Sequence, residues 1–292
     1  MKTSCFNPRF AVLAMAGTFG AVGVLHVPAA ARGTILDNFS SYAAGVQLNQ
    51  NAAWANTSGV WICGLHNGVN NSPGVYWSGG GYASAQYATA QGLPESGQTL
   101  ADSVDFNFTP SAYAPQGDQI FSTGFMYTPY PTNNYIFASV AVANTPSNEG
   151  LSLAIGSNTA YMGNAGWLAY NIPAAGAASN WFQLGLSMTK TTSGYNVGAS
   201  LYDLGSNGTG TPVLLQSFSA PSQPAANLGI NADSAFYAGF KYENVANEQL
   251  QGLNVDNFSL SQPATTLPEP SAGILATAGF ALLLPAFKRR RI

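Results

Sequence analysis

The sequence predicts an all-β protein, an antiparallel sandwich of two sheets with one apolar segment at each end of the chain. No long amphipathic helix pattern lies between residues 33 and 262. Short stretches of alternating apolar and polar residues recur there instead, separated by clusters of Gly, Asn, Ser and Pro. Only 7% of the residues are charged and 12% are aromatic, which favours a strand-rich domain over a disordered chain.

The first element, residues 1–31, is predicted to be a helical secretory signal peptide. Lys2 and Arg9 give a positive start, and an apolar run follows them. Ala29 and Ala31 are the small residues that a signal peptidase requires, so we expect cleavage after Ala31 and export of the chain. The alternative is that this segment remains uncleaved as an N-terminal membrane anchor.

The second element, residues 32–262, is predicted to form the sandwich as a single domain. The alternation places large apolar side chains on one face of each strand. The core residues predicted in this way are Phe106, Phe108, Phe182, Leu184 and Leu186. The predicted strands span 103–108, 119–127, 134–143, 181–189, 195–201, 211–219, 235–242 and 253–261.

One sequence echo links the two ends of this domain. Residues 35–40 read Ile-Leu-Asp-Asn-Phe-Ser, and residues 254–259 read Asn-Val-Asp-Asn-Phe-Ser. Nothing with a fixed period lies between them, so the echo does not indicate a repeat array. We expect the first and last strands to lie side by side in matching roles.

The last elements are a linker at 263–267 and a C-terminal segment at 268–292. Pro268, Glu269 and Pro270 disfavour a helix. The apolar run after them is just long enough for a transmembrane helix. The basic cluster, Lys288, Arg289, Arg290 and Arg291, would stay on the cytoplasmic side.

This C-terminal segment resembles the PEP-CTERM sorting signal of Gram-negative bacteria that produce exopolysaccharide. The resemblance covers residues 267–292 and rests on the Pro-Glu-Pro motif, the apolar helix and the basic tail. It implies an exosortase-type sorting enzyme as a partner, with signal peptidase acting at the other end. The precursor would be anchored in the inner membrane and then reach the cell surface or extracellular matrix. An ordinary tail anchor is the alternative.

The sandwich itself is similar to concanavalin A-like (laminin-G-like) jelly rolls. The similarity rests on the Asp-Asn-Phe opening, a hairpin after Trp181, and the closing stretch at 255–260. It implies a jelly-roll fold and a function in carbohydrate or surface binding.

The charge distribution argues against nucleic acid as a partner. The net charge is −3, and of the nine basic residues only Arg32, Lys190 and Lys241 lie within 32–262. Such a domain has no cationic surface for phosphate groups.

No catalytic or metal site is predicted. His66 is the only histidine after the leader, and Cys63 is three residues before it, a spacing that makes neither a dyad nor a zinc site. The paired-carboxylate motif of glycoside hydrolases is missing. Calcium is the one cofactor we weighed, with Asp37, Asp256 and the loop 203–208 as oxygen donors. The alternative, which we favour, is that these residues build turns.

Aromatic residues crowd the first third of the domain, where most must fill the core. Trp77 and Tyr82 flank a run of three glycines, so they are the candidates for a carbohydrate-binding surface. The predicted function is a non-enzymatic exported surface or matrix protein associated with exopolysaccharide. The alternatives are a lectin-like carbohydrate-binding protein and a secreted glycoside hydrolase.

Overall fold

The computed structural model describes most of the predicted sandwich and neither terminal segment. The described residues are 35–77, 82–110, 119–126, 135–145, 148–174, 176–230, 236–244 and 250–261. All of them belong to the second of two compact units, Arg32–Ile292. The predicted signal peptide with Ala29 and Ala31, the linker and the C-terminal sorting segment lie outside the described residues.

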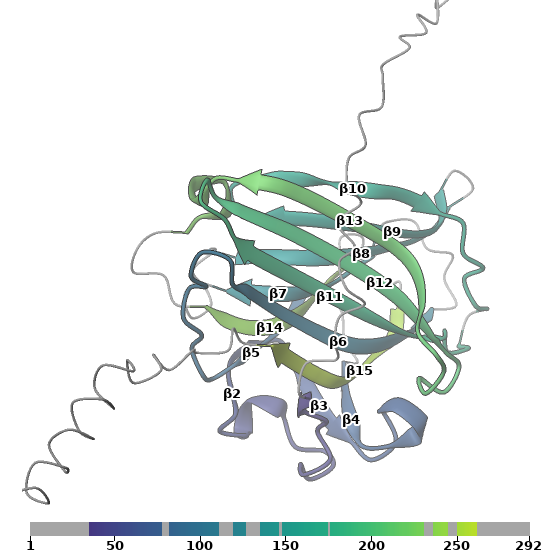
Figure 1. Cartoon of the computed structure of the whole chain (residues 1–292). Coiled ribbons are helices and arrows are strands. Elements are labelled where there is room, and N and C mark those ends of the chain that lie inside the picture. The colour runs from purple at the N-terminus through teal and green to yellow at the C-terminus, as the bar shows by residue number, and fades with distance from the viewer. Residues whose placement is uncertain are drawn as a thin grey trace, which may run out of the picture. The chain divides into compact units, whose positions relative to one another are not determined.

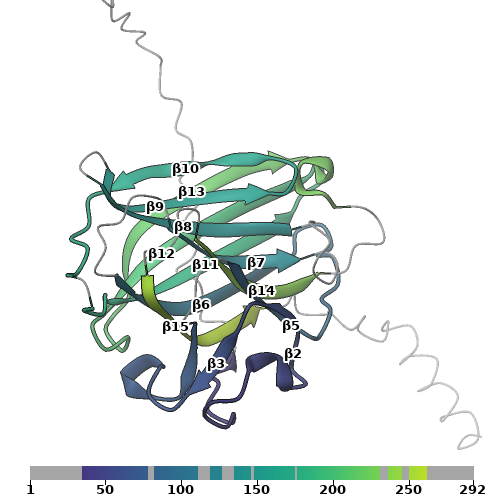
Figure 2. The same cartoon turned by 180° about the vertical axis from the view of Figure 1, so that it is seen from behind.

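The described strands form two antiparallel sheets that pack face to face, which confirms the predicted sandwich (Figures 1 and 2). Sheet A contains eight of them: β1 (Ile35–Asp37), β3 (Trp61–Gly64), β4 (Gly74–Trp77), β6 (Thr99–Pro110), β11 (Trp181–Lys190), β12 (Tyr195–Gly205), β13 (Val213–Gln223) and β15 (Leu250–Ser261). Their order is β13-β12-β11-β6-β15-β4-β3, and β1 also pairs with β15.

Sheet B contains the other seven described strands. They are β2 (Trp54–Ser58), β5 (Tyr82–Tyr87), β7 (Gln119–Met126), β8 (Tyr135–Thr145), β9 (Asn148–Ser157), β10 (Tyr161–Leu168) and β14 (Tyr237–Asn244). Their order is β10-β9-β8-β7-β14-β5-β2. The end strands β10 and β13 lie side by side at one edge of the sandwich (Figures 1 and 2).

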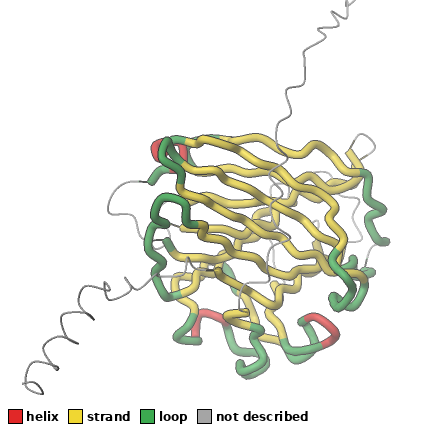
Figure 3. The backbone as a smooth tube through the Cα atoms, in the orientation of Figure 1, coloured by secondary structure: helices red, strands yellow, loops and turns green. Residues whose placement is uncertain are grey.

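Helix is confined to three short 3₁₀ turns among the described residues (Figure 3). They are η1 (Leu48–Gln50), η2 (Val69–Asn71) and η3 (Ala225–Leu228). Within this part of the chain, no helix has the length and apolar character needed to cross a membrane.

The core between the sheets is built by the alternation that the sequence predicts. The five predicted core residues, Phe106, Phe108, Phe182, Leu184 and Leu186, are each at most 1% exposed. Aromatic rings join the two layers: Trp61 packs on Phe240 at 5.0 Å between ring centroids, and Trp77 packs on Tyr242 at 4.3 Å. Rings of this size bury large apolar areas, so these contacts contribute much of the stability of the sandwich.

The echoed segments do lie side by side, as predicted. β1 pairs antiparallel with β15, and Asp37 lies opposite Phe258. Phe39 and Phe258 are both fully buried, and both pack on Trp54, at 5.7 and 5.2 Å between ring centroids. Their backbones differ, however: the positive φ falls at Phe39 in the first copy and at Asn257 in the second.

Candidate functional site

The outer face of sheet B gathers polar and aromatic side chains from three strands that are far apart in the sequence. In β14, Phe240 and Tyr242 enter the core, so Lys241 and Glu243 point outward. The register places Lys241 opposite Ser84 of β5, and Glu243 opposite Tyr82. Cross-strand partners share a face, so these side chains come together on the outside of the sandwich.

Lys241 lies among three aromatic rings on this face. Its ammonium group is 4.6 Å from the ring centroid of Tyr135, 5.0 Å from that of Phe137 and 6.0 Å from that of Tyr82. It also forms a 3.4 Å ion pair with Glu243. These five residues are called the Lys241 cluster below. Contacts of an ammonium group with aromatic faces offset part of the cost of removing it from water.

Burial shapes the electrostatics of the cluster. Lys241 is only 7% exposed, and this burial lowers the pKa of its ammonium group, while the Glu243 carboxylate acts in the opposite direction. The pKa of Tyr135 is raised by burial and by Glu243. The Glu243 side chain is 46% exposed, so the open side of the cluster presents a hydrogen-bond acceptor to solvent.

Two further side chains on this face have unused hydrogen-bonding capacity. Gln86 is 1% exposed, and neither its amide nitrogen nor its amide oxygen has a partner. The hydroxyl of Ser84, two residues away on the same face, is also buried without a partner. Buried polar groups are almost always paired in proteins, so we expect a buried water to bond with these two side chains, which are themselves closed to a ligand.

The two sequence candidates for carbohydrate binding separate in the structure. Tyr82 is half-buried on the outer face of sheet B and belongs to the Lys241 cluster. The prediction that Trp77 belongs to a binding surface is wrong, because Trp77 is 3% exposed and packs on Tyr242 within the core, which closes its ring to a ligand. The reason is strand alternation, because Val75 and Trp77 of β4 face the same way and both enter the core.

Sequence reasoning missed the other members of the cluster, Lys241, Glu243, Tyr135 and Phe137. A signal for Lys241 was present, since the predicted strand 235–242 alternates Phe240, Lys241 and Tyr242 and so points the lysine outward. The neighbouring rings come from β8, about a hundred residues earlier in the chain. Only the strand order brings them together.

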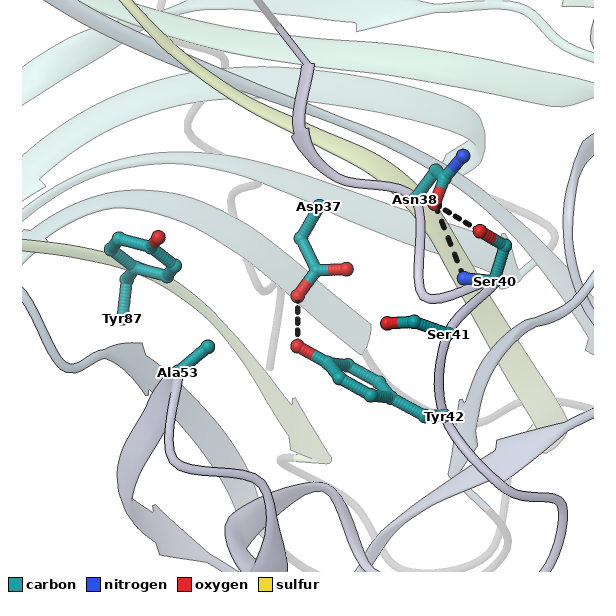
Figure 4. Close-up of a pocket in the computed structure, with 7 residues that line it drawn as sticks. All are labelled: Asp37, Asn38, Ser40, Ser41, Tyr42, Ala53 and Tyr87. Atoms are coloured by element: carbon teal, nitrogen blue, oxygen red, sulfur yellow. Dashed lines mark hydrogen bonds between the residues drawn. The ribbon is translucent and has the colours of Figure 1, made fainter.

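A separate small pocket lies beside β1, in the loop that follows it (Figure 4). Its volume is about 390 Å³, and it lies between Tyr87 on one side and Ser41 and Tyr42 on the other. The residues that line it are Asp37, Asn38, Ser40, Ser41, Tyr42, Ala53 and Tyr87.

The Asp37 carboxylate in this pocket has a structural role. One Asp37 oxygen accepts the Tyr42 hydroxyl at 2.5 Å and the Trp54 indole N–H at 2.7 Å, and the other accepts the Phe39 N–H at 2.7 Å. Burial and the bond to Asp37 raise the pKa of the Tyr42 phenol, so Tyr42 remains a donor. Three of the hydrogen-bonding positions of Asp37 are therefore used inside the protein.

The carboxylates considered as calcium donors accept hydrogen bonds from other groups of the protein. Asp256 accepts the Val69 N–H at 2.8 Å, and Asp203 accepts the Gly205 N–H at 2.7 Å. Within the described part of the chain, no three His, Cys, Asp or Glu residues gather as a metal site would require. Asp203 makes the bond of a turn, whereas Asp37 and Asp256 also accept bonds from residues far along the chain, Trp54 and Val69.

Cys63 and His66 do not form a reactive pair. Cys63 is 2% exposed in the core, and burial raises the pKa of its thiol to about 11. His66 is exposed, and its Nδ1 atom lies 3.4 Å from the Asn71 carbonyl oxygen. The thiol is therefore a buried apolar group without nucleophilic character.

Several solved structures are similar to this chain over about three quarters of its length. Lectin II from Ulex europaeus is 11% identical, with a TM-score of 0.46 over 76% of this chain and 97% of that one. The carbohydrate recognition domain of Emp47p is 11% identical, with a TM-score of 0.37 over 76% and 93%. The endo-1,3-beta-glucanase from Streptomyces sioyaensis is 10% identical, with a TM-score of 0.43 over 77% and 93%. At these TM-scores the likeness says nothing about what this chain binds.

No protein-family model matches the chain, and no curated protein is similar to it.

Proposed function

We propose that the sandwich is a carbohydrate-binding domain that holds its ligand on the outer face of sheet B and does not cleave it. The observation that carries this proposal is the half-buried Tyr82 ring next to the Glu243 carboxylate, whose side chain is 46% exposed, on the open side of the Lys241 cluster. The expectation that the sandwich is a jelly roll of the concanavalin A-like type is part of the same proposal.

The chemistry of the cluster suits a sugar. A sugar ring has apolar faces formed by C–H groups and a rim of hydroxyls. Tyr82 offers a half-buried ring for the apolar face, and the exposed Glu243 carboxylate accepts hydrogen bonds from hydroxyls. A largely aromatic lining with a few placed polar groups is the usual composition of a small-molecule site.

Binding without cleavage is supported by the small number of carboxylates on the strands of sheet B. Hydrolysis of a glycosidic bond requires two of them, about 5–5.5 Å or 6.5–9.5 Å apart. Among the described side chains on the strands of sheet B, Glu243 is the only carboxylate. Its carboxylate is also held by the 3.4 Å ion pair with Lys241.

The setting of the domain is proposed from the terminal segments. Cleavage after Ala31 by signal peptidase would export the chain, and the segment 268–292 would make it a substrate of an exosortase-type enzyme. The mature protein would then reside at the cell surface or in the matrix of a Gram-negative bacterium, where the resemblance of the C-terminal segment implies an association with exopolysaccharide.

The proposal is tested by probing the purified protein on a glycan array and by measuring release of reducing ends from the glycans that bind. We expect binding to at least one class of saccharide and no release. Absence of binding across the array would overturn the proposal. Release of reducing ends that is lost in Glu243→Gln would instead identify a glycoside hydrolase.

A further inference from the structure

Two aromatic side chains stand exposed on β10, the end strand of sheet B. Tyr161 is 67% exposed and Trp167 is 41% exposed. Among the side chains whose exposure the structure describes, these two are the only aromatic ones in the exposed class. Leaving large rings in water forgoes the favourable free energy of burial, so two of them on one strand suggest a binding surface.

Two bulges turn these rings to the same face. From Tyr161 to Asn164, and again from Asn164 to Trp167, β10 advances by three residues while β9 advances by two. In a regular strand, residues three apart point to opposite faces. Each extra residue returns the third position to the original face. Gly163 and Gly166, with φ of 123° and 83°, provide the backbone conformations that these bulges need.

The face that they share is the outer face of sheet B. Trp167 lies opposite Ser152 and Asn164 lies opposite Ala154, whereas the intervening Leu153 is fully buried in the core. The row formed by Tyr161, Asn164 and Trp167 therefore stands on the same side of the sheet as the Lys241 cluster.

The second bulge is locked from inside the sandwich. The Gln216 amide of β13 donates to the Gly166 carbonyl at 2.8 Å and accepts the Leu153 N–H at 2.9 Å. Leu153 is the β9 residue that has no partner in the register at this bulge, and Gly166 lies within the bulge. A buried glutamine from the other sheet thus satisfies both and fixes the turn that points Trp167 outward.

Asn164 is oriented between the two rings. Its amide nitrogen donates to the Tyr161 hydroxyl at 2.5 Å, and its amide oxygen accepts the Gly166 N–H at 2.9 Å. The Tyr161 hydroxyl, which accepts this bond, keeps its own proton for a ligand. The row therefore presents a ring, an amide and a second ring in a held geometry.

We propose that Tyr161, Asn164 and Trp167 form a platform for an extended, uncharged polysaccharide, an inference that rests on the proposed carbohydrate-binding function. The partner positions Gly156 and Ser152 lie four residues apart on β9, so the row spans ~13 Å at ~3.3 Å per residue. A row of this length exceeds one sugar ring and fits a polymer.

The surface beside the platform agrees with such an occupant. Next to it are the small residues of β9, Ser152, Ala154 and Gly156, which leave room for a chain to lie flat. The described side chains of β9 and β10 carry no charge, and Lys241 beside β8 is only 7% exposed and paired with Glu243, so the platform gives an anionic polymer little to bind. The two bulges also interrupt the free edge of β10, which disfavours pairing with a strand of another copy.

The test compares Trp167→Ala with the wild type by affinity electrophoresis in laminarin, dextran and hydroxyethyl cellulose, with alginate as a charged polymer. Leu214→Ala is the matched control, because Leu214 is 51% exposed on β13 at the same edge of the sandwich. We expect Trp167→Ala to weaken binding of at least one uncharged polymer about tenfold, while Leu214→Ala leaves it unchanged.

Retention of wild-type affinity in both Trp167→Ala and Tyr161→Ala would overturn the platform and leave the proposed function intact. A wild type that binds no polymer and no glycan on the array would overturn both. Light scattering gives a third result: a wild-type dimer that Trp167→Ala converts to a monomer would identify the face as an interface between copies and overturn the platform.

Discussion

The Asp37 carboxylate accepts the indole N–H of Trp54 at 2.7 Å, which joins β1 of sheet A to β2, an end strand of sheet B. The same oxygen accepts the Tyr42 hydroxyl, so one carboxylate holds the loop after β1 against both sheets. The echoed phenylalanines, Phe39 and Phe258, pack on the same indole. The start and end of the domain therefore meet at Trp54.

Replacing Asp37 with alanine should destabilise the domain, because it leaves the buried Trp54 N–H without an acceptor. We expect the free energy of unfolding to fall by about 1–3 kcal/mol. Urea denaturation followed by tryptophan fluorescence measures this change. Asn38→Ala is the control, since Asn38 is exposed and its amide bonds only to Ser40. Equal stability of Asp37→Ala and Asn38→Ala would show that the carboxylate is not a structural anchor.

Asp102 should make the stability depend on pH. It lies in the core, where one of its carboxyl oxygens accepts the Thr123 hydroxyl of the opposite sheet at 2.7 Å, and burial raises its pKa to about 8. The folded state therefore keeps a proton that the unfolded state loses at about pH 4. The contribution of Asp102 to the free energy of unfolding is therefore fully present below about pH 4 and is lost as the pH rises towards about 8. Over this range the free energy of unfolding should fall by at most about 1.4 kcal/mol per pH unit.

Asp102→Asn isolates this effect, because asparagine keeps the shape and cannot ionise. The difference in unfolding free energy between wild type and variant, measured by urea denaturation at pH 5, 6.5 and 8, should shift in favour of the variant as the pH rises. Burial also raises the pKa of Asp256, to about 6. Because Asp256 is present in both proteins, its contribution cancels from the difference in unfolding free energy. A difference that is constant with pH would mean that Asp102 is ionised in the folded state.

Gln216→Leu should loosen β10 without creating a cavity. The substitution leaves the Leu153 N–H and the Gly166 carbonyl inside the bulge without their partner. We expect a loss of about 1–3 kcal/mol in the free energy of unfolding. Hydrogen exchange should also show faster exchange at the Leu153 amide, whereas Leu215→Ala, on the neighbouring residue, should leave that amide protected. Unchanged exchange at Leu153 in Gln216→Leu would contradict the role given to the glutamine.

The sorting proposal predicts a specific phenotype. Replacing Pro268, Glu269 and Pro270 together by alanine should leave membrane insertion intact and block release to the surface, because the apolar run and basic cluster remain. Immunoblots of cell fractions from a host that contains the sorting enzyme measure this. Processing and localisation like those of the wild type would reduce the tail to an ordinary anchor.

The sequence was most informative where strands are regular. Alternation in 103–108 and 181–189 predicted the buried faces of β6 and β11 correctly, and the Asp-Asn-Phe echo predicted the β1–β15 pairing. It failed for Trp77, because the glycines after it indicated exposure while the position within the strand decided burial. Local context suggests where a chain turns, but strand parity decides where a side chain points.

The β10 segment shows why the platform was not predicted. The sequence 161–168 reads Tyr-Met-Gly-Asn-Ala-Gly-Trp-Leu, which has no period of two. Tyr161, Asn164 and Trp167 are spaced three residues apart, and only the two bulges place them on one face. The Lys241 cluster escaped prediction for a different reason, since its rings and its lysine come from β5, β8 and β14 and depend on the strand order. Neither kind of information is present in a local window.

The central claim, that the outer face of sheet B binds carbohydrate, is tested most directly by titrating the strongest ligand from the glycan array into Tyr82→Ala and Tyr76→Ala. Both tyrosines are half-buried, but Tyr82 lies on the outer face of sheet B and Tyr76 lies on β4 of sheet A. Isothermal titration calorimetry should show affinity about tenfold weaker in Tyr82→Ala and unchanged in Tyr76→Ala. Wild-type affinity in Tyr82→Ala together with a loss in Tyr76→Ala would contradict the claim and move the binding site to sheet A.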